Sequence, residues 1–334
     1  MTDLLVAENL SRYYNIRLPG GLFGQPAVLK AVDGVSFRLH RGRTLGIVGE
    51  SGCGKSTTAS LTIGLIPPTS GRTLLNGEPI ASAADARWRR QRRDMQMVFQ
   101  DPLAALDRRL SVGRQLMEPM VIHGIGSTAD RRERARELLS EVGLQPHHFD
   151  RYPHELSGGQ RQRVVLARAL MLNPSVVVCD EPVSALDVSI QAQVLALLEK
   201  LQAELNLAYL FISHDLRVVR QISHEVAVMY LGRIVEQGTP ERLFDNPEHP
   251  YTRMLLDAVP AAVGRSRSAR RTLPQGEPPN AINVPSGCPF HPRCPLAQSL
   301  CAAERPALEP LPDGQLVACH AAHGRIPRQQ ASVT

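Results

Sequence analysis

The fold is decided by nine residues near the start of the chain, GESGCGKST (residues 49–57). So many glycines would suit an ordinary surface loop, yet the apolar run TLGIV (44–48) precedes them and TASL (58–61) follows. This order predicts a loop between a buried strand and a helix. It matches the pattern G-x-x-x-x-G-K-[ST], in which backbone N–H groups and a lysine surround phosphate oxygens. The stretch therefore predicts a nucleotide-phosphate site.

The residue types in the loop explain the chemistry. Glycines let successive N–H groups converge on an anion, and the helix that follows directs its positive end at the same point. Lys55 can reach the β- and γ-phosphates, and Ser56 can bind Mg²⁺. Cys53 is interpreted as a spectator, because the loop needs only backbone groups there. The predicted nucleotide contacts in this loop are Gly49, Ser51, Gly52, Gly54, Lys55, Ser56 and Thr57.

Two further stretches contain candidate metal-binding, catalytic or anion-binding residues. VVVCDEP (176–182) places Asp180 and Glu181 at the end of a buried strand, where Asp180 can hold Mg²⁺ through water and Glu181 can polarise an attacking water. Alone, the stretch fits equally well a strand that ends in two solvent-facing acids, but a phosphate loop upstream favours the metal site. LSGGQ (156–160) is a second glycine-rich anion site before a helix; by itself it also fits a capped helix start.

The composition of the chain limits the class of protein and the partners that we expect. The chain has 334 residues, 43% of them hydrophobic, which suits two globular domains. The net charge of +6 comes almost wholly from arginine and shows no aromatic-interleaved basic patch, so we expect no nucleic-acid partner. No run approaches the ~18 apolar residues of a membrane span, and MTDLLVAENL at the start lacks a basic secretory region. We therefore expect a cytoplasmic protein.

Hydrophobic periodicity predicts an α/β fold. Strands and turns are expected over 4–50, a helix over 55–65, short strands near 72–75 and 79–80, and a strand over 94–99. Helices are expected through 103–172, and a continuously apolar strand ends at Asp180. A helix (190–205), a strand (208–212), a helix (215–222), a hairpin (226–236) and a short helix between prolines near 250 follow. Residues 260–287 have the Arg-, Pro- and Gly-rich character of a linker.

Six ordered motifs together resemble the ATP-binding subunits of ABC transporters, over roughly residues 3–240. The matches are GESGCGKST with the Walker A loop, VVVCDEP with Walker B, LSGGQ with the family signature, Gln100 in MVFQDP with the Q-loop, Asp187 in SALD with the D-loop, and His214 in ISHD with the switch histidine. Tyr14 is the candidate for the aromatic that stacks on adenine, and Tyr13 is its rival.

The resemblance implies a fold. It is a P-loop NTPase (RecA-like) core with an antiparallel β subdomain and an inserted α-helical signature subdomain at about 101–158. The nucleotide-binding domain is expected over 1–240. An irregular Cys-rich C-terminal extension of the oligopeptide-importer type is expected over 241–334.

It also implies a mechanism. Two cassettes pair head to tail, with ATP between the Walker A loop of one and the signature of the other. The signature contacts are Ser157, Gly158, Gly159 and Gln160, and Asp187 lies nearby. Mg·ATP would be organised by Lys55, Ser56, Gln100 and Asp180. The metal ion itself would be held by Ser56, Gln100 and Asp180. Glu181 would activate water and His214 would hold the γ-phosphate end.

Other stretches resemble the ATPases of dipeptide and oligopeptide importers, most closely the second ATPase subunit of a dipeptide importer. They are VSALDVSIQAQVL, FISHDL, VMYLGRIVEQG, HPYTRMLL and GCPFHPRCP. Relatives that import nickel or glutathione share much of this pattern. The implied partners are a sister ATPase, in a heterodimer rather than the competing homodimer, two membrane permease subunits, and indirectly an extracytoplasmic peptide-binding protein. The permeases would dock near the Gln100 loop and the helical segment, on the cytoplasmic face of the membrane.

Two rival classes fit less well. A soluble ABC ATPase of DNA repair would insert long coiled coils between Gln100 and Ser157, and one of translation would carry two cassettes. A non-hydrolysing iron–sulfur or redox regulator would not need a complete catalytic set with Glu181.

Four of the six cysteines lie in the last fifth of the chain, at Cys288, Cys294, Cys301 and Cys319. Five, six and seventeen residues separate them, so the tight pairs of structural zinc sites are missing. Four thiolates with wider gaps can hold an iron–sulfur cluster. A [4Fe–4S] cluster is therefore favoured, and zinc and free thiols or disulfides remain as alternatives. Cys179 is interpreted as a core residue, and His147, His148 and His154 as surface or packing residues.

Overall fold

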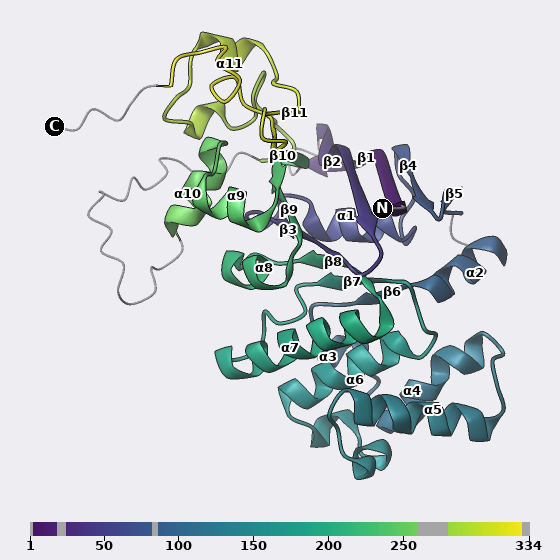
Figure 1. Cartoon of the computed structure of the whole chain (residues 1–334). Helices are drawn as coiled ribbons and strands as arrows, with labels where there is room; N and C mark the ends of the chain where they lie inside the picture. Colours follow the sequence, from purple (N-terminus) through teal and green to yellow (C-terminus); the bar gives the residue numbers. More distant parts are fainter. Residues whose placement is uncertain (1–2, 19–24, 82–85, 259–279, 329–334) are drawn as a thin grey trace.

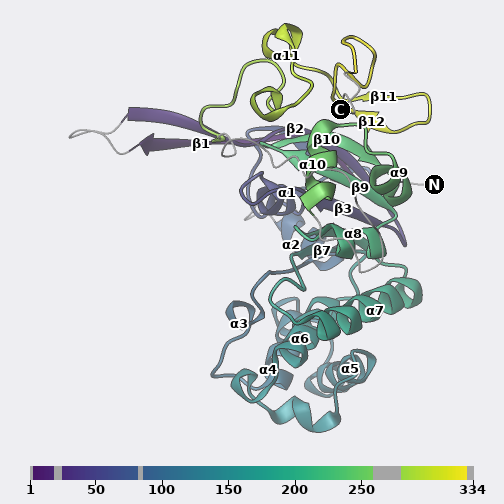
Figure 2. The same cartoon turned by 90° about the vertical axis from the view of Figure 1, so that its left-hand side faces the viewer.

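The computed structural model describes residues 3–18, 25–81, 86–258 and 280–328. Within these residues the strands form two sheets, and a separate group of helices lies beyond one edge of the larger sheet (Figure 1). Figure 2 shows the same division from the side, with the C-terminal segment at the opposite end from α4 and α5. Residues 260–279 of the expected linker lie outside the described residues.

The smaller sheet is antiparallel, in the order β2-β1-β4-β5. Its strands are β1 (Asp3–Leu18), β2 (Gln25–His40), β4 (Ser70–Leu75) and β5 (Glu78–Pro79). Asn76 and Gly77 turn β4 into β5 with positive φ angles of 50° and 80°, the backbone that a two-residue hairpin requires. The expected short strand pair is confirmed.

The larger sheet has the order β11-β12-β10-β9-β3-β8-β7-β6. Its strands are β3 (Thr44–Val48), β6 (Met95–Val98), β7 (Val176–Asp180), β8 (Ala208–Ile212), β9 (Glu225–Tyr230), β10 (Arg233–Gly238), β11 (Glu309–Pro310) and β12 (Leu316–Val317). From β9 to β6 neighbouring strands run parallel, and every residue of β3, β7 and β8 is buried. Such strands are uniformly apolar because both faces are covered, and the carboxyl ends of β6, β7 and β8 meet at one edge.

The helices follow the predicted pattern with three additions. They are α1 (Lys55–Thr62), α2 (Ala86–Asp94), α3 (Pro102–Ala105), α4 (Val112–Ile122), α5 (Thr128–Glu141), α6 (Gly158–Leu170), α7 (Val188–Leu205), α8 (Leu216–Ile222), α9 (Pro240–Asp245), α10 (Pro250–Ala258) and α11 (Ser299–Ala303), with 3-10 turns at Pro146–Asp150, Pro153–Glu155 and His291–Arg293. The sequence did not predict α2, α9 or α11. The stretch that forms α2, ARWRRQRRD, has almost no apolar periodicity to reveal a helix.

The C-terminal segment is less irregular than expected. Strand β12 pairs with β10 through Glu236↔Val317 and Gln237↔Leu316, so the segment extends the larger sheet. It also has a small core, made by Cys301, Val317, Cys319, Ala321 and Ile326. The pairing requires partners far apart in sequence, which local pattern does not reveal. Among the helices that the structure describes, none has the length and apolar character to cross a bilayer.

Candidate functional site

The glycine-rich loop joins the end of β3 to the start of α1, as expected. Gly54, directly before α1, has φ 105°, and a Cβ there would lie 2.1 Å from the Ala31 carbonyl oxygen. A side chain is therefore excluded both by backbone conformation and by contact with β2. Lys55 is 5% exposed and folds over the loop, where its Nζ donates to the carbonyls of Gly49 (2.8 Å) and Glu50 (3.0 Å).

Two of the three residues predicted to bind magnesium, Ser56 and Asp180, lie in contact, whereas Gln100 binds Glu181. The Ser56 hydroxyl donates to Asp180 Oδ1 at 3.0 Å, although 124 positions separate the two residues. Burial raises the pKa of Asp180, and the charge of Glu181 adds to that effect while the Ser56 hydrogen bond opposes it. A hydroxyl beside a partly buried carboxylate is a suitable pair of oxygen ligands for Mg²⁺.

Glu181 stands at the centre of a second group. Its Oε2 accepts a hydrogen bond of 3.0 Å from Gln100 Nε2, and His214 Nδ1 lies 3.0 Å from the same oxygen. Glu181 has φ 49°, an unusual angle for a residue with a side chain. These residues follow the carboxyl ends of β7, β6 and β8, so the parallel sheet brings three distant motifs to one carboxylate. This is the arrangement expected of a polarised water site.

The LSGGQ stretch begins α6. Ser157 accepts a hydrogen bond from the Gln160 N–H at 3.3 Å, and Gln160 Oε1 accepts from the Ser157 N–H at 2.9 Å. The two residues thus form a capping box. A Cβ on Gly159 would lie 2.6 Å from Ile190 Cγ2, because this turn packs against α7. Asp187 caps α7 by accepting from the Ile190 N–H at 3.0 Å, and this hydrogen bond lowers its pKa.

The structure does not bring the LSGGQ stretch to the phosphate loop of the same chain. The hydrogen bonds of Ser157 remain within the first turn of α6. In Figure 1, α6 lies among the lower helices, whereas α1 lies beside the smaller sheet above. The two glycine-rich turns are therefore separate surfaces of one chain.

The two adjacent tyrosines of β1 have different surroundings. Tyr13 Oη donates to Asp33 Oδ1 at 2.6 Å, and Asp33 is also bound by Arg233. The guanidinium of Arg12 lies 4.6 Å from the centre of the Tyr14 ring. The hydroxyl of Tyr13 is thus engaged in a polar network, whereas Tyr14 contacts Arg12 through its ring face.

The four C-terminal cysteines line one small cavity, together with His249, His291 and His320. All six cysteines of the chain are free, which does not support the disulfide alternative. Burial raises the pKa of Cys288 to about 11 and that of Cys294 to about 12. Among the residues that the structure describes, no group of three or more His, Cys, Asp or Glu side chains is arranged to hold a metal ion. The four cysteines border one cavity, but the expected metal site is not confirmed.

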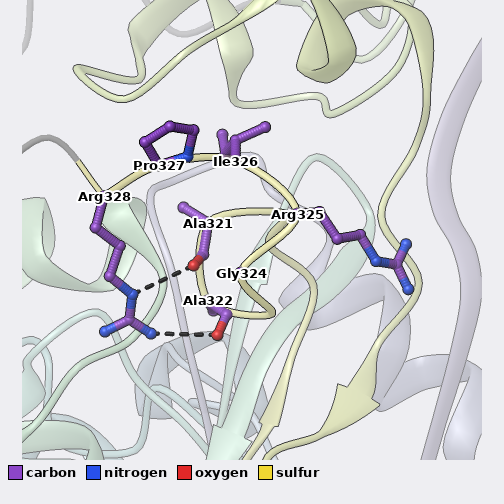
Figure 3. Close-up of a pocket in the computed structure, with 7 residues that line it drawn as sticks. All are labelled: Ala321, Ala322, Gly324, Arg325, Ile326, Pro327 and Arg328. Carbon is purple, nitrogen blue, oxygen red and sulfur yellow. Dashed lines mark hydrogen bonds between the residues drawn. The ribbon is translucent and has the colours of Figure 1, made fainter.

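A surface hollow of about 450 Å³ lies at the end of the C-terminal segment (Figure 3). Arg328 reaches back across it to the carbonyls of Ala321 and Ala322. None of the predicted nucleotide contacts lines this hollow, which separates it from the site described above.

Contacts from the C-terminal half reach the phosphate loop, and the sequence did not predict them. Glu50 accepts a paired hydrogen bond from Arg293 and donates its N–H to the Tyr251 hydroxyl. Both partners lie in stretches noted for other reasons, HPYTRMLL for its family pattern and GCPFHPRCP for its cysteines. No local signal links either stretch to the loop.

Comparison with known proteins agrees with this geometry. Residues 32–184 match the family described as ABC transporter, and residues 235–301 match the oligopeptide/dipeptide transporter C-terminal region. The chain is 49% identical over 320 residues to the di/tripeptide transport ATP-binding protein DppF of Pseudomonas aeruginosa, covering 96% of this chain and 98% of that protein. It is 50% identical over 309 residues to the oligopeptide transport ATP-binding protein OppF of Salmonella typhimurium, covering 92% of each.

A solved structure shares the fold. The ATP-binding cassette MJ0796, as a dimer in a post-hydrolysis state bound to ADP and phosphate, superposes with a TM-score of 0.61 at 27% identity, covering 71% of this chain and 98% of that one.

Proposed function

The chain belongs to the ABC transporter family, among the ATP-binding proteins with an oligopeptide/dipeptide transporter C-terminal region, and from this membership we propose that it hydrolyses ATP to drive the import of di- and oligopeptides. It is an ABC-type ATPase, which converts ATP and water to ADP and phosphate. The observation that carries the proposal is the junction of Gln100, Glu181 and His214 beside the Ser56–Asp180 pair.

Each residue has a proposed role. The backbone of the loop from Gly49 to Thr57 surrounds the phosphates, and Lys55 binds the β- and γ-phosphates. Ser56, Gln100 and Asp180 would hold Mg²⁺, which neutralises charge on the phosphate oxygens when bound. Glu181 takes the proton from the attacking water, and His214 orients that carboxylate and contacts the γ-phosphate. Tyr14 stacks on adenine.

The separation of the two glycine-rich turns supports a site shared between two cassettes. Residues 157–160 would contact ATP bound mainly by the partner, since they lie away from the phosphate loop of their own chain. The related cassette seen as a dimer with ADP and phosphate supports the same arrangement. We propose a heterodimer with a sister ATPase.

The remaining assignments rest on the family. The nucleotide-binding domain occupies 1–240, with the helical subdomain at about 101–158, and the C-terminal extension occupies 241–334. Two permease subunits dock on the exposed region around Gln100 and α4, at the cytoplasmic face of the membrane. An extracytoplasmic peptide-binding protein delivers the solute.

A reconstitution experiment tests the proposal. The chain is purified with the membrane subunits that accompany it and placed in liposomes with the binding protein. ATP hydrolysis is expected to rise when dipeptides are added and to be lost in Lys55→Ala. Stimulation by nickel or glutathione in place of peptides would overturn the peptide assignment. Recovery of the chain with DNA-repair or translation factors, and without membrane subunits, would overturn the transport function.

We propose a [4Fe–4S] cluster as a structural cofactor of the C-terminal segment, whose four cysteines line one small cavity. A cluster takes four cysteine sulfurs. The described side chains are not arranged as a metal site, so the cysteines that line this cavity would have to move together around the cluster. Cys288, Cys294, Cys301 and Cys319 would hold it and would lose their protons on binding. The raised pKa values of Cys288 and Cys294 oppose that loss. The cluster would hold a segment whose own core is small.

Metal analysis after anaerobic purification tests this cofactor. A brown protein with iron and sulfide in equal amounts is expected, and Cys288→Ser should lose the colour. A colourless protein with one zinc per chain would establish the zinc alternative. A metal-free protein would leave free thiols as the resting state of the segment.

A further inference from the structure

Glu50, the second residue of the phosphate loop, is held through all three of its polar groups. Its N–H donates to Tyr251 Oη at 2.9 Å, and its carbonyl accepts from Lys55 Nζ at 3.0 Å. Its carboxylate accepts two hydrogen bonds from Arg293, Nη1 to Oε2 at 2.8 Å and Nη2 to Oε1 at 2.9 Å. Neighbouring residues of the loop are the proposed nucleotide contacts, whereas Glu50 binds Arg293 and Tyr251 of the C-terminal half.

The ion pair with Arg293 is shielded from solvent. The side chain of Arg293 is 4% exposed and that of Glu50 is 27% exposed. Two parallel N–H···O bonds fix direction as well as distance, and screening is weak at this depth. The hydrogen bond to Glu50 is the main reason that the pKa of Arg293 is raised. Most other ion pairs of the chain are far more exposed and should contribute little.

The position of Arg293 is itself fixed by the C-terminal segment. Its N–H donates to the Phe290 carbonyl at 3.0 Å, and the Phe290 ring is 1% exposed. That ring packs against Tyr230 and Tyr251 with centroid distances of 5.3 and 5.5 Å. Tyr251 is the residue that binds the Glu50 N–H. One aromatic cluster therefore orders both of the groups that hold Glu50.

We propose that Arg293 is a positioning residue for the phosphate loop, through which the C-terminal cysteine segment sets the affinity for nucleotide. The inference rests on the ATP site proposed above. The loop must present consecutive N–H groups to the phosphates, so a small displacement of Glu50 moves donors that bind the ligand. Arg293 lies between Cys288 and Cys294, and disorder in that segment would reach the loop through this pair.

Binding of fluorescent N-methylanthraniloyl-ADP with Mg²⁺ to the full chain tests the proposal. Arg293→Gln and Glu50→Gln should each weaken binding by about tenfold, the change expected when a charge-assisted hydrogen bond is lost. Because both variants break one interaction, the double variant should bind no more weakly than the weaker single variant. Arg293→Lys keeps the charge and loses the paired geometry, so its affinity should fall between those of the parent and Arg293→Gln.

Arg328→Gln is the matched control. Arg328 lies in the same C-terminal segment and pairs with Glu248 instead of the phosphate loop. Because the Arg328 side chain is 50% exposed, Arg328→Gln should lower the melting temperature less than Arg293→Gln does, and it should leave nucleotide affinity unchanged. In the assembled complex, Arg293→Gln should raise the KM for ATP more than it lowers kcat.

Parent affinity in both Arg293→Gln and Glu50→Gln would overturn the proposal, as would losses that multiply in the double variant. Equal loss of affinity in Arg328→Gln would also overturn it, since the effect would then follow general stability. Failure of the parent to bind nucleotide, or unchanged binding in Lys55→Ala, would instead overturn the ATP site itself.

Discussion

Replacement of Glu181 by glutamine should leave the site assembled and stop its chemistry. The carboxylate accepts from Gln100 and lies against His214, both at 3.0 Å on the same oxygen. Glutamine has the same shape and keeps one acceptor oxygen, so both neighbours retain a partner. The amide cannot take a proton from water. The phosphate loop and the Ser56–Asp180 pair do not contact this side chain through hydrogen bonds and should bind Mg·ATP as before.

The size of the effect follows from the role assigned. A positioned general base contributes about 10²- to 10⁴-fold to the rate. This corresponds to about 2.7–5.4 kcal/mol of activation free energy, at 1.36 kcal/mol for each factor of ten. The upper part of the range is expected, because the carboxylate is largely shielded and two neighbours orient it.

Phosphate release by the assembled complex measures the turnover, and gel filtration with ATP measures dimerisation. We expect Glu181→Gln to bind ATP with the parent affinity and to accumulate as an ATP-bound dimer. Asp215→Asn is the control: this acid at the neighbouring strand end caps α8, and asparagine caps helices equally well. Turnover of Glu181→Gln within tenfold of the parent, with Asp215→Asn unaffected, would refute Glu181 as the base.

Three further outcomes follow from the same geometry. Gly159→Ala places a methyl group 2.6 Å from Ile190 Cγ2, so turnover of the assembled complex should fall at least tenfold while the isolated chain binds ATP normally. Equilibrium binding should show that Tyr14→Ala weakens ATP binding about tenfold, whereas Tyr13→Phe lowers only the melting temperature. His249 is buried neutral, and burial lowers its pKa to about 3, below its ordinary 6.5. The unfolded chain gains this proton first, so urea unfolding should show stability lost as the pH falls from 6.5 toward 3, by up to about 1.4 kcal/mol per pH unit, and less steeply in His249→Asn.

The sequence predicted the core of the fold because that core repeats simple patterns. Strands buried on both faces are continuously apolar, and the runs at Thr44–Val48, Val176–Asp180 and Ala208–Ile212 need no long-range information. Helices with an amphipathic stripe were equally visible. Helix α2 was missed because most of its residues are charged and only Ala86 and Trp88 are apolar, so its own periodicity does not reveal a helix.

The site could be predicted because its motifs lie at strand ends. A parallel sheet gathers the carboxyl ends of its strands at one edge, so Gln100, Glu181 and His214 are adjacent although far apart in sequence. The order of strands was not readable from pattern alone. The resemblance to a known family assigned a role to each of the three residues, and in the structure their side chains meet at Glu181.

The ion pair between Glu50 and Arg293 could not be predicted from the sequence. The two residues are 243 positions apart, and each has a complete local explanation without the other. Glu50 occupies a variable position of the G-x-x-x-x-G-K-[ST] pattern. Arg293 is one of many arginines in the chain, and its place between two cysteines does not mark it as a partner of the loop. A charge pair has no periodicity, so composition and spacing cannot reveal it. The pair forms because β12 joins the edge of the larger sheet and Phe290 packs on two tyrosines, which seats the cysteine segment beside the loop. If that seating depends on what the cysteines hold, nucleotide affinity will change with the state of the cysteine cavity in the parent and will be insensitive to it in Arg293→Gln.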